Sequence, residues 1–189
     1  MKVLNLFILA IFIVSCKTST LEKIVFDHSN LNKFSFNVYE KKIKISYKST
    51  LNDSFIEHVM KTSPAERVHA WLENNISNFG TMNKLEVNIQ EASVLRKEIT
   101  TEKKVAGVMK QQDEYLYELN FLVKFNLYND DKKLLATSDI KVSRSTTSSE
   151  FISLNERDHI LNKLTLNSLN DLSDKSLELL KIHMSDFML

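Results

Sequence analysis

The sequence predicts an α+β fold, in which a mainly antiparallel sheet of roughly four strands carries two helices on one face. Three observations support this prediction. Several stretches alternate apolar with polar residues, as strands do, and two longer stretches repeat apolar residues at helical spacing. Each helical stretch also opens with a capping signal. The order along the chain is strand, helix, three strands and helix, which is typical of an α+β domain.

The first strand is expected between residues 34 and 47, where every second residue is apolar. The phase of this alternation changes across residues 39–42. We therefore expect one long strand with a bulge or a bend at that point. The preceding residues, 17–32, are polar and predict a flexible tether, in which Ile24-Val25-Phe26 is the one candidate for a short edge strand.

The first helix is expected to begin after Ser63, which is suited to cap it. Pro64 fits the first helical position, and Glu66 completes a capping box. The apolar residues that follow lie at helical spacing: Val68, Trp71, Leu72, Ile76 and Phe79. Gly80 is expected to end the helix as a left-handed cap.

Three further strands follow the first helix. Residues 85–95 alternate, with a phase shift after Ile89 that again indicates a bulge. Residues 98–112 are charged and rich in lysine, which predicts a connecting loop. Residues 115–128 keep one face apolar without a break and form the strongest strand. Asn129-Asp130-Asp131-Lys132 is a hairpin turn, and the chain returns as a fourth strand from residue 134 to about 145.

The second helix is expected after a bend at residues 145–149, which are all serine or threonine. Ser153 and Glu156 form a second capping box at its start. The helix runs to about Met184, and its apolar stripe is Leu161, Leu164, Leu169, Leu172, Leu179 and Ile182. We expect this stripe, and Trp71 of the first helix, to lie in the core.

The first fifteen residues differ from the rest of the chain. Lys2 gives a positive start, and residues 3–14 are apolar except for one asparagine. A run of about a dozen apolar residues is too short to cross the bilayer, which takes about 20 residues of helix, but it fits a secretory signal. The expected organisation is a signal peptide at 1–15, a tether at 16–32 that begins with an acylated cysteine, and one domain at 33–189.

The signal ends in Ile13-Val14-Ser15-Cys16, which resembles a bacterial lipobox. The resemblance implies cleavage between Ser15 and Cys16, a diacylglyceryl group on the Cys16 thiol, and a fatty acyl chain such as palmitate on the new amino end. By the sorting rule of such lipoproteins, Lys17 in place of aspartate favours the outer membrane, facing the periplasm, over the inner membrane. The alternative is a signal-anchor helix with an incidental cysteine.

Composition excludes several classes of protein. One cysteine cannot form an internal disulfide or a thiolate metal cluster. The two glycines, Gly80 and Gly107, are too far apart for a glycine-rich phosphate loop. The chain carries 25 Lys+Arg against 24 Asp+Glu, a formal net charge of +1, which argues against nucleic acid as a partner.

No residue pattern indicates catalysis, a metal or a cofactor. None of the five histidines lies three or four positions from another, so no helix presents a two-histidine metal face. Glu57-His58 is the one acid/base candidate, but adjacent side chains usually point apart, which favours a structural or surface role. We therefore expect no enzyme activity and no cofactor. A degenerate hydrolase that uses Glu57 and His58 is the catalytic alternative.

The charged connection around residues 96–110 is the candidate surface for contact with a partner or a membrane. It consists of basic residues that flank a small apolar tip: Arg96, Lys97, Lys103, Lys104, Val105, Gly107, Val108, Met109 and Lys110. Lysines add about 1 kcal/mol each near acidic headgroups. The alternative is an ordinary solvated hairpin loop. The open face of the sheet is a second candidate, and its side chains are polar: Lys42, Lys44, Glu118, Lys124, Asn126, Asp139 and Lys141.

Several of these segments together resemble a group of uncharacterised alphaproteobacterial lipoproteins. They are the proline-initiated helix start from Pro64 to Trp71, Glu91-Ala92-Ser93-Val94, the paired hairpin at 115–145, and Leu154-Asn155-Glu156-Arg157. Glu57-His58 also fits. More distantly, the element order is similar to that of the lipopolysaccharide-assembly lipoprotein and of the auxiliary lipoprotein of lipid-transport ABC systems. The resemblance implies a non-enzymatic, periplasm-facing lipoprotein.

The function expected from the sequence is that of a lipid-anchored protein of the cell envelope. It supports the assembly or transport of outer-membrane components by binding a protein partner, while its acyl chains hold it on the membrane. The alternative is a periplasm-facing carrier of lipid or another small ligand, with a cleft between the sheet and the helices.

Overall fold

The computed structural model describes residues 21–22, 24–105 and 108–189. Within these ranges the strands are β1 (Phe34–Phe36), β2 (Glu40–Ile45), β3 (Ile76–Asn78), β4 (Lys84–Val105), β5 (Val108–Tyr128) and β6 (Leu134–Ser149). The helices are α2 (Pro64–Asn75) and α3 (Leu154–His183). Three short 3-10 turns complete the description: η1 (His28–Asn30), η2 (Glu57–Val59) and η3 (Ser185–Phe187).

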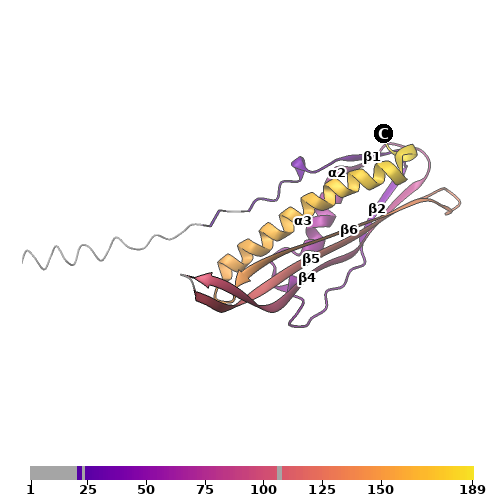
Figure 1. Cartoon of the computed structure of the whole chain (residues 1–189). Helices are drawn as coiled ribbons and strands as arrows, with labels where there is room; N and C mark the ends of the chain where they lie inside the picture. The colour runs from indigo at the N-terminus through magenta and orange to yellow at the C-terminus, as the bar shows by residue number, and fades with distance from the viewer. Residues whose placement is uncertain (1–20, 23, 106–107) are drawn as a thin grey trace, which may run out of the picture.

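The main sheet has four strands in the order β2-β4-β5-β6. β2 runs parallel to β4, whereas the β4–β5 and β5–β6 pairs are antiparallel. Figure 1 shows α2 and α3 on the same side of this sheet, and α3 packs mainly on β6. The predicted α+β class, with a mainly antiparallel sheet and two helices on one face, is therefore confirmed.

The segment expected to be one bulged strand at 34–47 is instead two strands in two different sheets. β1 pairs in parallel with β3, while β2 joins the main sheet. The end of the chain extends the smaller sheet, since the Leu189 amide donates to the Ser35 carbonyl at 2.9 Å and Asn37 donates to Phe187 at 2.8 Å. The change of phase in the sequence thus marks a change of sheet, because the two halves face different neighbours.

Helix α2 begins as predicted and ends earlier than predicted. Ser63 and Glu66 form the capping box, with Pro64 in the first turn. The helix stops at Asn75, and the next residues form β3, so Gly80 is not its cap. A Cβ at Gly80 would lie 2.5 Å from the backbone of Asn37 and Val38. Glycine is therefore required here by a close approach of two backbones and not by a left-handed conformation.

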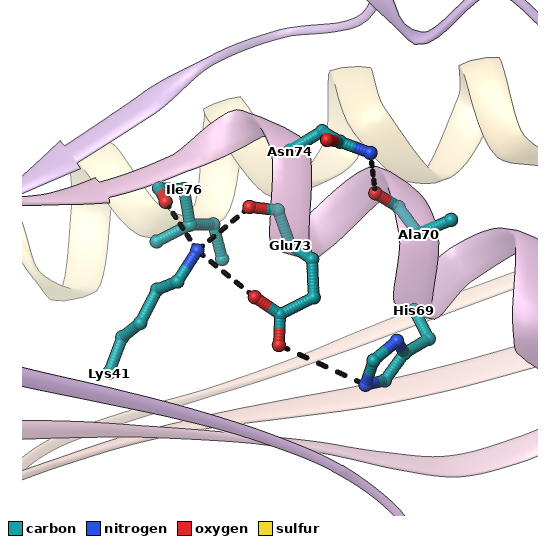
Figure 2. A network of polar contacts seen from close by, with 6 residues as sticks. All are labelled: Lys41, His69, Ala70, Glu73, Asn74 and Ile76. Atoms are coloured by element: carbon teal, nitrogen blue, oxygen red, sulfur yellow. Dashed lines mark hydrogen bonds and ion pairs between the residues drawn. The ribbon is translucent and has the colours of Figure 1, made fainter.

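The C-terminal end of α2 is fixed by Lys41 of β2 (Figure 2). Its ammonium group donates to the carbonyls of Glu73 and Ile76, each at 2.8 Å, and lies 3.3 Å from the Glu73 carboxylate. A cation at this end of a helix satisfies carbonyls that have no helical partner. It also interacts favourably with the negative end of the helix dipole. His69 lies 3.9 Å from Glu73 and is partly exposed.

β4 and β5 form a hairpin that is longer than predicted. The register shifts between Ile89 and Glu91, which confirms the bulge expected in β4. Beyond it, the two strands remain paired up to Val105 and Val108, so the prediction of a loop at 98–112 is wrong. β-branched residues such as Ile99 and Thr100 favour strand conformation. Their partners on the other strand are close in sequence, so cross-strand side-chain pairs stabilise the hairpin up to its turn.

β6 also continues past its predicted end. The serine and threonine run at 145–149, expected to be a bend, pairs with residues 114–118 of β5. The turn before β6 is confirmed: Lys132 has a φ of 63°, and the Asn129 side chain accepts a bond from the Lys133 amide at 2.8 Å. Asparagine is well suited to this role because its short side chain bonds the nearby backbone.

The core lies between the main sheet and the helices. Ser153 and Glu156 form the predicted capping box of α3, which ends at His183. Trp71 is completely buried and contacts Phe34 edge to face, with ring centroids 6.0 Å apart. The largest fully buried side chains also include Phe36, Phe121, Phe125, Leu72 and Leu85. Phe79, predicted on the helical stripe, lies beyond β3 and is 70% exposed. None of the described helices is long and apolar enough to cross a bilayer.

Candidate functional site

The predicted contact residues Arg96 and Lys97 both have partners inside the domain. The Arg96 guanidinium lies 4.9 Å from the centre of the Tyr115 ring, and its amide donates to the Ser54 carbonyl at 2.8 Å. The Lys97 ammonium lies 3.1 Å from the Glu118 carboxylate. Its hydrogen bond to this carboxylate lowers the pKa of Glu118. These two residues therefore stabilise the hairpin locally.

The remaining predicted contact residues lie at or near the far end of the β4–β5 hairpin. The strands include Lys103, Lys104 and Val105 in β4 and Val108, Met109 and Lys110 in β5. β6 pairs with β5 only as far as Glu114, so the two strands extend past the third. Gly107, Ser15, Cys16 and the predicted signal peptide at 1–15 lie outside the described residues.

A cleft of about 240 Å³ lies where the hairpin passes the end of β6. Its lining includes four carboxylate side chains: Glu98, Asp113, Glu114 and Glu150. Thr100 donates to Asp113 at 3.0 Å across the hairpin. In the part of the chain that the structure describes, no cluster of three or more His, Cys, Asp or Glu side chains is arranged to hold a metal ion. The lining of this cleft is therefore mainly acidic.

Glu57 is a buried carboxylate whose burial the sequence reading did not anticipate. It is 2% exposed, and it accepts hydrogen bonds from the Tyr47 hydroxyl, from Ser49 at 2.7 Å and from the Val94 amide at 3.2 Å. Burial raises the pKa of Tyr47, and so do its hydrogen bond to Glu57 and the negative charge of that carboxylate. His58 is exposed, so the two adjacent side chains point apart as expected.

The contacts of Glu57 attach the irregular segment 46–62 to β4. Next to Glu57, the Ile56 amide donates to the Val94 carbonyl at 2.9 Å, and Phe55 forms an isolated bridge with Leu95. A shallow cleft of about 210 Å³ lies beside them. Three donors occupy the two oxygens of Glu57 and His58 makes no hydrogen bond with it, which indicates a structural role for the carboxylate. The only sequence signal is an acidic residue in a mostly apolar segment, residues 55–60.

Residues 26–32, which we call the strap, lie against both helices. Asn75 of α2 is buried, and its side-chain amide donates to the carbonyls of His28 at 2.9 Å and Leu31 at 3.0 Å. The Asn32 amide donates to Ser173 of α3 at 2.8 Å, and its side chain donates to Asp174 at 2.9 Å. This part of the predicted tether is therefore attached to the domain, and residues 24–26 do not form the edge strand considered for them.

The start of the strap is held by an arginine. The Arg67 guanidinium lies 3.3 Å from the centre of the Phe26 ring and donates to the Asn162 side chain of α3 at 3.1 Å. Burial lowers the pKa of Arg67. Asp27 begins η1 by accepting a bond from the Ser29 amide at 2.9 Å, and the bonds from Ser29 lower its pKa. Phe26 to Asn32 thus follow a defined path over α2 and α3.

The open face of the main sheet is polar, as the sequence predicted. Lys44 lies 3.7 Å from Glu86, and Lys124 lies 3.4 Å from Asp139. Lys141 is exposed and makes no ion pair with any other described residue. Exposed ion pairs of this kind contribute about 0–1 kcal/mol each. They cover this face of the sheet with charged side chains.

Comparison with protein-family models and with curated proteins finds no match to this sequence. Two solved structures, both of bacterial proteins, are among those with a weak similarity to this chain. A minor lipoprotein from Acinetobacter baumannii has a TM-score of 0.36 and 9% identity, covering 74% of this chain and 92% of that chain. A homolog of neuraminyllactose-binding hemagglutinin from Helicobacter pylori has a TM-score of 0.41 and 12% identity, covering 87% and 93%.

Proposed function

We propose that this chain is a lipid-anchored lipoprotein of the bacterial cell envelope. The observation that carries the proposal is the motif Ile13-Val14-Ser15-Cys16 at the end of an apolar signal. Removal of residues 1–15 leaves Cys16 as the amino terminus, with acyl chains on its sulfur and nitrogen. Each buried methylene contributes about 0.8 kcal/mol, so two or more chains hold a protein stably on a membrane. Lys17 favours the outer membrane.

The role that we propose for the domain is to bind a protein partner without catalysing a reaction. The polar, ion-paired face of the sheet supports this role, because it is accessible and carries Lys141 without an ion-pair partner among the described residues. The hydrogen bonds of Glu57 support a structural function for the most buried carboxylate among the described residues. The process served by the partner is the assembly or transport of outer-membrane components.

A carrier with a cleft between sheet and helices gains no support from the described core. Trp71, Phe121 and Phe125 lie in this space at 0% exposure, so protein side chains fill it. Interiors packed in this way leave little room for a ligand. Protein binding through the surface is therefore the function that we retain.

In-cell photo-crosslinking tests the proposed function. A photo-reactive residue replaces Lys141 on the open sheet face, and a matched variant carries it at Glu178, an exposed position on α3. We expect the probe at position 141 to trap one defined envelope protein and the probe at position 178 to trap it far less. A Cys16→Ala variant should leave the outer-membrane fraction. Equal labelling from both positions, or none, would contradict partner binding by this face.

A further inference from the structure

The strap fixes the direction in which the chain leaves the domain. Its end, Asn32, is bonded to Ser173 of α3, whereas its start, Phe26, lies under Arg67, which is bonded to Asn162. Positions 162 and 173 are about three helical turns apart, or about 16 Å along α3. Followed backward from residue 32, the chain therefore runs toward the N-terminal end of α3, as Figure 1 shows.

The same contacts limit how far the domain can be from a lipid anchor. Cys16 precedes Phe26 by ten positions in the sequence. A fully extended chain spans about 3.3–3.6 Å per residue, so this segment reaches about 35 Å at most. If Cys16 is acylated, as proposed above, the start of the strap stays within about 35 Å of the bilayer. The inference that follows rests on that proposed function.

This end of the domain carries exposed apolar side chains. Phe151 is 89% exposed and Leu154 is 68% exposed, and both lie where β6 leads into α3. The far end of the β4–β5 hairpin lies at the same end of the molecule (Figure 1). Exposed phenylalanine and leucine side chains that lie together at one end of a domain are typical of contact surfaces, since apolar area is favourably removed from water.

We propose that Phe151 and Leu154 enter the interfacial region of the bilayer that holds the acyl chains of Cys16. This end of the domain then faces the membrane, and the β5–β6 turn faces away from it. The lipid is recognised by burial of these apolar side chains. The contact gives the tethered domain one preferred orientation.

The chain offers a matched control at the opposite end of the domain. Phe79 is 70% exposed, and its amide donates to the Phe36 carbonyl. It lies shortly before Lys84, which pairs with Tyr128 at the start of the β5–β6 turn. Residues 114–128 of β5 separate the two ends by about 45 Å at the rise of an antiparallel strand. Phe79 is therefore a control for an exposed apolar residue that lies far from the anchor.

Site-directed spin labelling of the full-length, acylated protein tests this inference. The chain has one cysteine, and acylation blocks its thiol, so Phe151→Cys and Phe79→Cys each provide one reactive site. The labelled proteins are reconstituted into phosphatidylcholine vesicles, and collisions of the label with oxygen and with a water-soluble nickel chelate are compared. A label that enters the interface to roughly 5–10 Å is reached more by oxygen than by nickel.

We expect nickel access to fall several-fold for the label at position 151 on going from detergent to vesicles, and to stay unchanged for the label at position 79. Similar nickel access at both positions in vesicles would overturn the inference. The mass of the N-terminal peptide is measured on the same samples. An acylated protein with an exposed label at position 151 contradicts the membrane contact alone, whereas an unacylated protein contradicts the proposed function.

Discussion

Replacement of Glu57 with alanine tests how the segment 46–62 is held on β4. The carboxylate is 2% exposed and accepts bonds from Tyr47, Ser49 and the Val94 amide. Val94 is completely buried, so its amide would lose its partner without access to bulk water, at about 1–3 kcal/mol. Tyr47 and Ser49 are partly exposed or exposed and regain bonds to water. We expect Glu57→Ala to lower the free energy of unfolding by about 1–3 kcal/mol, a large part of the ~5–15 kcal/mol typical of a domain.

Urea denaturation of the purified protein, followed by the fluorescence of Trp71, measures this loss. Glu178→Ala is the matched control, because Glu178 is an exposed carboxylate on α3, and its removal should change stability by about 0.5 kcal/mol or less. Glu57→Gln keeps the size of the side chain and one acceptor oxygen and should fall between the two. The reasoning is refuted if Glu57→Ala unfolds at the same urea concentration as Glu178→Ala.

Three further changes follow from the same structure. Gly80→Ala places a Cβ 2.5 Å from the backbone of Asn37, so urea denaturation should show a loss of about 1–3 kcal/mol; an unchanged midpoint would contradict the close approach. Lys41→Met removes two hydrogen bonds to the end of α2, so the same assay should show a free energy of unfolding lower by about 1–2 kcal/mol. An unchanged free energy of unfolding would mean that Lys41 does not stabilise this end of the helix. Tyr47 has a raised pKa in the folded state, so its stabilising effect is present below its ordinary pKa of 10.0 and declines as the pH rises above it. Between pH 9 and 11 the free energy of unfolding should therefore fall less for Tyr47→Phe than for the unmodified protein. An identical fall with pH in the two proteins would contradict a raised pKa of Tyr47 in the folded state.

Signals contained within a few residues were sufficient to predict much of the fold. Ser63 with Glu66, and Ser153 with Glu156, opened the two helices as expected, and the phase shift after Ile89 marked a real bulge. These features depend on neighbours three or four positions away, or on the alternation of a single strand. They could therefore be recognised without knowledge of the tertiary structure.

Two features that the sequence did not predict depend on contacts between distant segments. The chain at 34–47 divides because β1 finds its partners at residues 76–78 and at the C-terminal end. Gly80 is explained only by the backbone of Asn37 and Val38, which lies about forty positions earlier. The change of phase at residues 39–42 fits a bulge within one strand and a break between two strands equally well, so the sequence did not separate the two cases.

Two adjacent asparagines show that the residues that hold the strap could not be predicted from sequence either. Asn74 is exposed and donates to the Ala70 carbonyl of its own helix at 2.7 Å, as Figure 2 shows. Asn75 is buried and holds the carbonyls of the strap. The residue type is identical, and only the direction of each side chain on the helix separates the two roles. Asn75→Ala should accordingly make residues 26–32 more sensitive to a protease, whereas Asn74→Ala should not.

The central claim is that Cys16 carries the lipid that holds this protein on a membrane. The most direct measurement is the mass of the N-terminal peptide of the protein purified from its membrane fraction. We predict a peptide that begins at Cys16 and carries a diacylglyceryl group on sulfur, with a further acyl chain on its amino group. A peptide that still contains residues 1–15, or one that begins at Cys16 with a free thiol, would contradict the account.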